Sequence, residues 1–244
     1  EALAWRAFDA GRFGDAERHI ARAEGLLAQW PDALRHANFV FLRGLIARAI
    51  GSMDRADRLF SAAGRAYAEA GNRQGRASVQ NERGEMALHR GDLASAEQCY
   101  LRAHAVFDEL DHPSVIATEL NLGRVCDALG RFAEGGRWRR SARERAERAG
   151  NSTMGLFADA TLLADDARAA DWPAFDARLT QLDPLRDARL VALEVAQAAQ
   201  TAAGLCLAAG QPERAHAARV IAIAQYHALG RHDLAAALLR ARHR

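Results

Sequence analysis

A short interruption recurs along the sequence at a nearly constant interval, and this repeat limits the fold more than any other feature does. Each interruption centres on a glycine or its equivalent, and a large apolar residue follows two positions later in five of the six copies. The central positions are 11, 51, 91, 130, 170 and 210, which gives spacings of 40, 40, 39, 40 and 40. A fixed period of this length indicates one supersecondary unit copied end to end, so we expect stacked repeats.

The composition predicts that the repeated unit is helical. Alanine and arginine, both strong helix formers, are abundant, and the 244 residues include only five prolines. A glycine at each interruption can adopt the left-handed backbone conformation that ends a helix. Small residues seven positions before the turn and five positions after it allow two antiparallel helices to approach closely. Each repeat should therefore be a helix pair.

The expected helices follow from the turns, the caps and the apolar periodicity. The first helices of the pairs should span 1–10, 33–50, 74–90, 113–129, 152–169 and 186–209. The second helices should span 14–29, 53–70, 93–110, 132–149, 172–182 and 212–229, and a last helix should span 232–242. Asp92 and Asp171 fit N-cap positions, and Pro113, Pro184 and Pro212 fit the first turns of helices.

Four residues depart from the repeat pattern. Leu163 and Phe175 occupy positions that are small in the other copies. Arg139 and Arg219 stand nine residues after the turn, where other copies carry Ile20, Phe60, Tyr100 and Leu179. These departures make the later copies the most divergent.

The second copy, with Gly44, Gly51, Ala56, Phe60 and Ala63, resembles the tetratricopeptide repeat, and copies three and four continue the likeness. The resemblance implies an all-α fold, a right-handed superhelical α-solenoid of about six helix-turn-helix repeats plus a C-terminal capping helix. We expect a single solenoid over 1–244, with repeats at about 1–32, 33–73, 74–112, 113–151, 152–185 and 186–230 and a cap at 231–244.

Charge and hydropathy exclude several classes of protein. The net charge is +2, from 33 basic and 31 acidic residues, and this balance does not suggest a nucleic-acid partner. No window of about eighteen residues is free of charge, so no transmembrane helix is expected. Cys99, Cys126 and Cys206 lie far apart without a CxxC motif, which favours reduced core thiols in a cytoplasmic protein.

No motif for catalysis, a cofactor or a metal stands out. The sequence contains no Walker loop, GxGxxG, GxSxG or HExxH pattern. The nine histidines are scattered, and paired carboxylates such as Asp165 and Asp166 are typical of a solvated helix face. We therefore expect a protein that is not an enzyme and that holds neither a cofactor nor a metal.

The resemblance also implies a partner site. In tetratricopeptide proteins the first helices line a concave surface that generally holds an extended peptide or a partner helix. Transferring the groove positions of the family to this chain predicts that a protein or peptide contacts Asn38, Phe41, Arg48, Asn81, Glu85, Arg124, Asp127, Gln197 and Gln200.

Two stretches carry opposite charge. Residues 131–148 contain seven arginines against three glutamates, and residues 158–187 contain seven aspartates against three arginines. These stretches could dock a partner or a second copy of the chain. Alternatively, they could be solvated outer faces, screened within about 10 Å at physiological salt.

Long repeats of this kind occur in bacterial signalling proteins, such as MalT-like regulators and tetratricopeptide domains linked to kinases or caspase-like proteases. The resemblance therefore implies a scaffold that binds a protein or peptide and acts as the sensing or regulatory part of a larger protein. The alternatives are a helical arm of a protease, kinase or ATPase, a receptor for a peptide or small molecule, and a self-assembly module.

Overall fold

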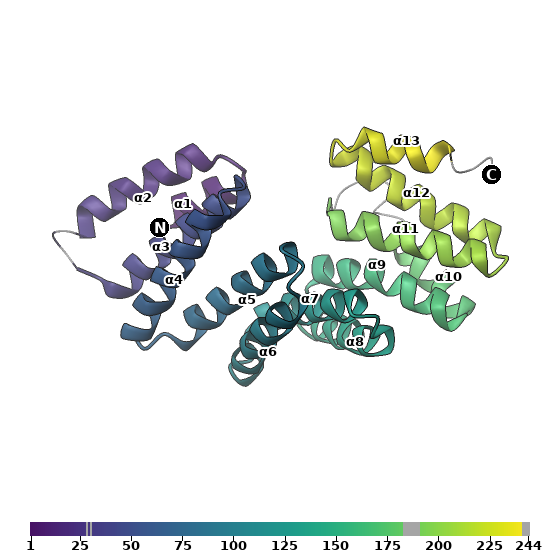
Figure 1. Cartoon of the computed structure of the whole chain (residues 1–244), viewed down its shortest axis with the longest axis horizontal. Coiled ribbons are helices and arrows are strands. Elements are labelled where there is room, and N and C mark those ends of the chain that lie inside the picture. The colour runs from purple at the N-terminus through teal and green to yellow at the C-terminus, as the bar shows by residue number, and fades with distance from the viewer. Residues whose placement is uncertain (28, 30, 183–190, 241–244) are drawn as a thin grey trace. The chain divides into compact units, whose positions relative to one another are not determined.

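A computed structural model describes residues 1–27, 29, 31–182 and 191–240, and these residues form helices and turns without a strand (Figure 1). The described residues contain thirteen helices: α1 Ala2–Asp9, α2 Phe13–Leu27, α3 Ala33–Ala49, α4 Met53–Glu69, α5 Arg73–His89, α6 Leu93–Glu109, α7 Ser114–Ala128, α8 Phe132–Arg148, α9 Ser152–Ala169, α10 Trp172–Gln181, α11 Leu193–Ala208, α12 Pro212–Ala228 and α13 His232–Arg240. The all-α prediction and the order of the helices are confirmed.

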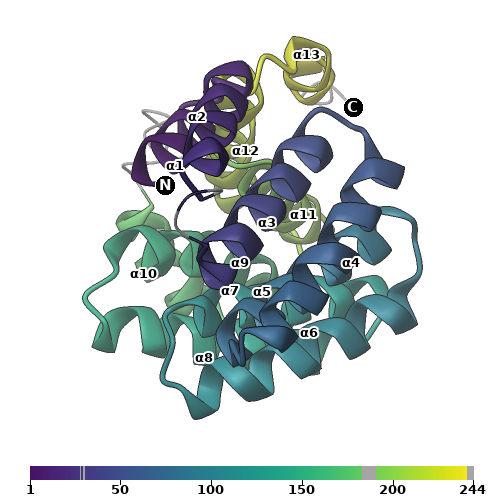
Figure 2. The same cartoon turned by 90° about the vertical axis from the view of Figure 1, so that its left-hand side faces the viewer.

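Consecutive helices pack as antiparallel pairs, as the repeat predicts. Figure 2 shows α3 beside α4 and α5 beside α6, and the contacts between these helices agree. Glycines at five of the six predicted turns have positive φ angles, between 68° and 79°, and Ala170 replaces glycine at the sixth turn with a φ of 53°. Asp92 and Asp171 accept hydrogen bonds from Ser95 N and Ala174 N, which confirms both as N-caps.

The chain divides into two compact units, Glu1–Thr118 and Glu119–Arg244, and the division falls within α7. The core of the N-terminal unit contains Phe39, Leu42, Phe60 and Met86. The main core of the C-terminal unit contains Leu163, Phe175, Val195 and Ile221. No described helix is long and apolar enough to cross a membrane.

The small positions of the repeat allow a bulky side chain of the partner helix to fit closely. A Cβ added at Gly44 would lie 2.6 Å from Phe60 Cε1, and one at Gly84 would lie 2.7 Å from Tyr100 Cε1. Both rings are fully buried. In these two pairs, therefore, a glycine on the first helix accommodates the aromatic ring that the second helix inserts.

Arg139 occupies the place of Phe60 and Tyr100 in the fourth copy. Its side chain lies against Gly123, as the rings lie against Gly44 and Gly84, and Arg139 is only 3% exposed. In the fifth copy, Leu163 and Phe175 are both buried in the core cluster of the C-terminal unit. The departures seen in the sequence are thus local changes of packing within the same helix pairs.

Two helix ends fall on residues outside the described part of the chain. The predicted start of the eleventh helix, at 186, lies there, and the described helix α11 begins at Leu193. The N-cap Ala192 is extended, with a φ of −149°, and its N–H donates to Gln225 Oε1 at 3.0 Å. The last four residues of the predicted cap, 241–244, also lie outside the described residues.

Candidate functional site

The first helices of the N-terminal unit carry a row of polar side chains. We call the surface formed by Asn38, Arg48, Asn81, Glu82 and Glu85 the α3–α5 face. Each of these residues is half-buried. The sequence predicted four of them and missed Glu82, which lies next to Asn81 on α5.

Arg48 and Glu82 form an ion pair that joins α3 to α5. Arg48 Nε lies 3.0 Å from Glu82 Oε2, and the two side chains are 33% and 14% exposed. Burial raises the pKa of Glu82, while the charge of Arg48 and a hydrogen bond from Asn81 act in the opposite direction. The two largely buried groups therefore compensate each other through this ion pair.

The two asparagines of the α3–α5 face use their amides to join neighbouring helices. Asn38 Nδ2 donates to Glu1 Oε1 at 2.8 Å, and Asn38 Oδ1 accepts from the Tyr67 hydroxyl at 2.8 Å. Asn81 Oδ1 accepts from Thr118 Oγ1 at 3.3 Å. An amide has both donors and acceptors, so these side chains can also bond the backbone of an extended peptide.

Tyrosines of the second helices support this face, and the sequence analysis named only Tyr100, as a bulky packing residue. Tyr100 donates to Glu85 Oε2 at 2.8 Å, as Tyr67 does to Asn38. Both rings are buried, and burial raises the pKa of Tyr67. The two tyrosines stand at different repeat positions, 16 and 9 residues after their turns, so the repeat pattern gave no signal for their hydroxyl groups.

Phe41, a predicted groove residue, lies in an aromatic cluster and is 8% exposed. Its ring centroid is 6.5 Å from Trp5, 5.7 Å from Phe60 and 6.2 Å from Tyr67. A ligand on the α3–α5 face would therefore reach only the edge of this ring.

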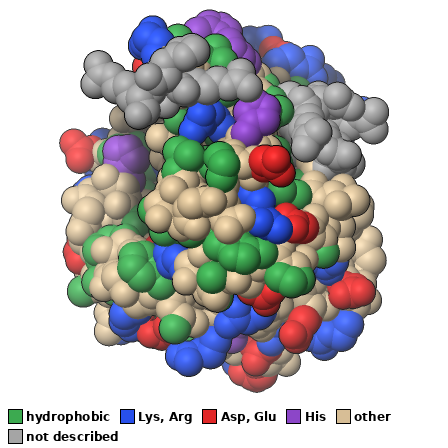
Figure 3. Space-filling model, turned by 90° about the vertical axis from the view of Figure 1, so that its right-hand side faces the viewer, with side chains coloured by type: hydrophobic (Ala, Val, Ile, Leu, Met, Phe, Trp, Pro, Cys, Tyr) green, Lys and Arg blue, Asp and Glu red, His purple; other side chains and the backbone are tan. Residues whose placement is uncertain are grey.

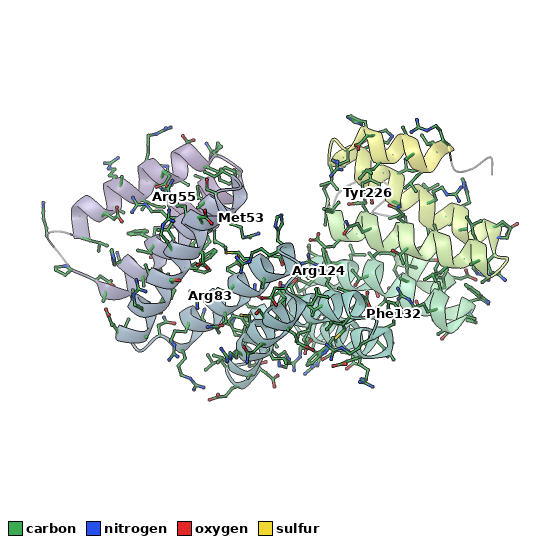
Figure 4. All side chains as sticks on the ribbon, viewed as in Figure 1. Met53, Arg55, Arg83, Arg124, Phe132 and Tyr226 are labelled. Carbon is green, nitrogen blue, oxygen red and sulfur yellow. The ribbon has the colours of Figure 1, made fainter. Side chains whose placement is uncertain are left out.

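The other predicted groove residues belong to the C-terminal unit, where each has a different setting. Arg124 of α7, labelled in Figure 4, lies 3.7 Å from Glu194 of α11 and donates to Asn121 Oδ1 at 3.1 Å. Gln200 accepts from the hydroxyl of Tyr226, also labelled there, at 2.7 Å. Gln197 is exposed. Asp127 accepts two hydrogen bonds from Arg139, at 2.9 and 3.0 Å.

The two oppositely charged stretches pair with each other inside the C-terminal unit. Arg139 binds Asp165 at 2.7 Å, and Arg143 binds Asp159 at 2.9 Å. Arg178 also binds Asp159. On the face drawn in Figure 3, basic and acidic side chains lie beside one another. Much of the charge in these stretches is therefore compensated within the chain, and Asp183 and Asp187 lie outside the described residues.

The cysteines have the environments of core thiols. Cys126 and Cys206 are buried and Cys99 is half-buried, all as free thiols. Burial raises the pKa of Cys206 to about 11 and also raises the pKa of Cys99. Because the thiolate is the nucleophile, neither of these two groups is activated for attack at neutral pH.

Comparison with known proteins identifies the repeat. The family model described as tetratricopeptide repeat matches residues 75–149. A comparison with curated proteins gives no match.

Solved structures match almost the whole chain. A Rap conjugation gene regulator of the plasmid pLS20, in complex with the Phr* peptide, has a TM-score of 0.69 and 16% identity over 95% of this chain and 62% of that chain. A Rap protein complexed with Competence and Sporulation Factor has a TM-score of 0.65 and 15% identity, and the match covers 98% of this chain and 71% of that chain. BtubC from P. vanneervenii has a TM-score of 0.65 and 15% identity, and the match covers 89% of this chain and 90% of that chain.

At these identities the structural matches establish the fold, and the family match, the helix pairs and the glycine turns agree with it. Residues 75–149 match the tetratricopeptide repeat, and the fold of the chain is similar to those of solved Rap regulators.

Proposed function

We propose that the chain binds an extended peptide on the α3–α5 face and serves as the sensing module of a larger bacterial signalling protein. One observation carries the proposal: Arg48 and Glu82 form a largely buried ion pair that joins α3 to α5, with Nε and Oε2 3.0 Å apart. The guanidinium has further N–H donors and the carboxylate has a second oxygen, and these can bond the C=O and N–H groups of a peptide.

The asparagines extend the same chemistry along the face. Asn38 and Asn81 lie on α3 and α5, on the helices that carry Arg48 and Glu82. Side-chain amides can hold a peptide through its backbone, while neighbouring side chains select its sequence. Peptide binding by a structural neighbour, the Rap regulator with the Phr* peptide, supports the same function for this chain.

The proposal assigns no catalysis to the chain itself. Binding would act by changing the population of conformations of the solenoid, since a ligand shifts an equilibrium by its differential affinity for the two states. The free thiols fit a reducing compartment, so we place the protein in the cytoplasm.

A phage-displayed library of random twelve-residue peptides tests the proposal. A peptide recovered on the immobilised protein would be synthesised, and its affinity measured by fluorescence polarisation. The double variant Arg48→Gln/Asn81→Ala should bind it at least about tenfold more weakly, since hydrogen bonds to charged groups contribute about 1.5–3 kcal/mol each.

The matched control is Arg58→Ala/Gln98→Ala, which changes exposed residues of α4 and α6. The control should bind as the unchanged protein does, and thermal melting should show both variants folded. Equal affinity of the test variant and the unchanged protein, or recovery of no peptide from the library, would contradict the proposal.

A further inference from the structure

The turn between α12 and α13 brings two imidazole rings together. His227 lies in the last turn of α12, and His232 is the first residue of α13. Their Nδ1 atoms are 3.0 Å apart, and their ring centroids are 5.3 Å apart. Both residues are exposed, so an ion could reach them from solvent and keep water ligands.

The backbone fixes the approach of the two rings. Gly230 has a φ of +70°, and Arg231 N donates to Tyr226 O at 2.8 Å, which closes the end of α12. α13 then packs back on α12 through Tyr226, Ala235 and Leu238. The two histidines therefore face each other because the turn and the small core beneath it hold both helix ends.

Two facing Nδ1 atoms form a chelate when both are unprotonated. Without a metal, one of them must carry the hydrogen that the other accepts. If each imidazole instead carries its hydrogen on Nε2, both Nδ1 atoms are available to coordinate one ion. Neutral imidazole is the form that binds transition metals, and it does so through either nitrogen.

We propose that His227 and His232 form a site for a late divalent transition metal of the Ni²⁺ or Cu²⁺ class. Metal–imidazole bonds of about 2.0–2.1 Å place ligands 3.0 Å apart at an angle of about 95°. That angle fits adjacent positions of a square-planar or octahedral ion. A tetrahedral zinc site would need the two nitrogens about 3.3–3.4 Å apart.

The site would have two protein ligands, with water completing the coordination. Among the described residues, no third histidine, cysteine or carboxylate atom joins the pair within 4.8 Å. Such an ion would tie the first turn of α13 to the last turn of α12. Because α13 otherwise docks through a small apolar cluster, the ion should slow the opening of α13.

Isothermal titration of the full chain with NiCl₂ tests the site. The protein would carry no histidine tag, would be treated with EDTA and dialysed, and would be kept at pH 8. We expect one saturable Ni²⁺ site. His227→Asn/His232→Asn should weaken it at least about tenfold, because losing the chelate removes the benefit of a second linked ligand. The matched control His36→Asn/His89→Asn changes two exposed histidines of the N-terminal unit and should leave the affinity unchanged.

Hydrogen exchange provides a second readout. Ni²⁺ should slow exchange of the α13 amides in the unchanged protein and in the control, and it should leave α13 unaffected in the His227→Asn/His232→Asn variant. The proposal would be overturned by equal Ni²⁺ affinity of that variant and the unchanged protein, by the absence of saturable binding, or by tighter binding of Zn²⁺ than of Ni²⁺.

Discussion

Glu82 is the residue on which the proposed binding surface depends most. Its carboxylate is 14% exposed, and its hydrogen-bonding capacity is only partly used. Because it lies on α5 beside Asn81, a ligand that bonds one of them would reach the other. The sequence could not reveal its burial, since a glutamate on a polar helix face is usually solvated.

The stability of the protein should depend on pH through Glu82. Burial raises the pKa of this carboxyl above its ordinary value of 4.5, so the folded state favours the protonated form. Its contribution to stability is therefore complete below pH 4.5 and is lost as the pH rises through the raised pKa. Glu82→Gln should remove this loss, with a slope difference of up to about 1.4 kcal/mol per pH unit.

Urea unfolding of both proteins at a series of pH values from 4 to 8 measures this effect. As the pH rises, the free energy of unfolding of Glu82→Gln should increase relative to that of the unchanged protein. A difference that is constant with pH would show that the carboxyl is not perturbed in the fold.

Glycines inside helices should respond to an added methyl group according to the ring that they face. Gly44→Ala would place a Cβ 2.6 Å from Phe60, and Gly84→Ala one 2.7 Å from Tyr100. Overpacking of this kind should lower the free energy of unfolding by about 1–3 kcal/mol. Gly204→Ala meets nothing within 4 Å on α11 and should raise it by about 0.5–1 kcal/mol.

Chemical denaturation of the three variants checks the pattern. The contrast between Gly44 or Gly84 and Gly204 separates the packing effect from helix propensity, since all three are helix-interior glycines. If all three changes stabilised the protein equally, the small–bulky packing of the repeat would be refuted.

At the scale of the element, the turn after α9 departs from the others. Ala170 has a φ of 53°, a left-handed conformation that costs an L-residue about 1–2 kcal/mol. Ala170→Gly should remove this cost, while the greater conformational entropy of glycine in the unfolded chain offsets part of the gain. The net effect should be a rise of about 0.5–1 kcal/mol in the free energy of unfolding.

The reverse change at an equivalent turn is the control for Ala170. Gly130 has a φ of 73°, and Gly130→Ala should lower the free energy of unfolding by about 1 kcal/mol. Denaturation of the two variants in parallel should therefore give shifts of opposite sign. Shifts of the same sign would mean that the backbone at residue 170 is not held in the left-handed region.

Arg139 joins three helices of the C-terminal unit through buried charge. It binds Asp127 of α7 and Asp165 of α9, and these carboxylates raise its pKa although burial alone would lower it. Arg139→Met would leave both carboxylates without their shared cation and should lower the free energy of unfolding by about 3–5 kcal/mol. Adding Asp127→Asn and Asp165→Asn should recover part of this loss. A loss below 1 kcal/mol for Arg139→Met would show that solvent reaches the cluster.

The sequence predicted the helix pairs well because each boundary carries its own local signal. A glycine with positive φ, followed by a capping side chain such as Asp92 or Asn72, fixes where one helix ends and the next begins. The predicted bounds differ from the described ones by one or two residues at most ends. The start of α11 lacked such a signal, because Ala192 is held by Gln225 from another helix.

The proposed binding surface was harder to predict than the helices. Repeat positions identified Asn38 and Arg48, which lie on α3, and Asn81 and Glu85, which lie on α5. The same positions gave Phe41, which packing buries, and Asp127, which Arg139 binds. Whether a residue at a repeated position is accessible to a ligand depends on side chains that contact it from other helices. The sequence of one repeat does not show which side chains these are.

At the scale of the whole molecule, the described residues form six helix pairs and a last helix, and solved structures of similar fold include a Rap regulator in complex with a peptide. The opposite charges of its C-terminal half are used largely within that half, between α8, α9 and α10. The Arg48–Glu82 ion pair, with Asn81 beside it, is the reason that the proposed peptide site is placed on the N-terminal unit.

Photo-crosslinking tests the peptide site most directly. The peptide recovered from the random library would carry a benzophenone in place of one residue at a time, and mass spectrometry would identify the crosslinked residues. Crosslinks should concentrate on α3 and α5, around Asn38, Arg48, Asn81 and Glu82, and should weaken in the Arg48→Gln/Asn81→Ala variant. Crosslinks confined to the exposed surfaces of α4, α6 and α8, and unchanged in that variant, would contradict binding by the first helices.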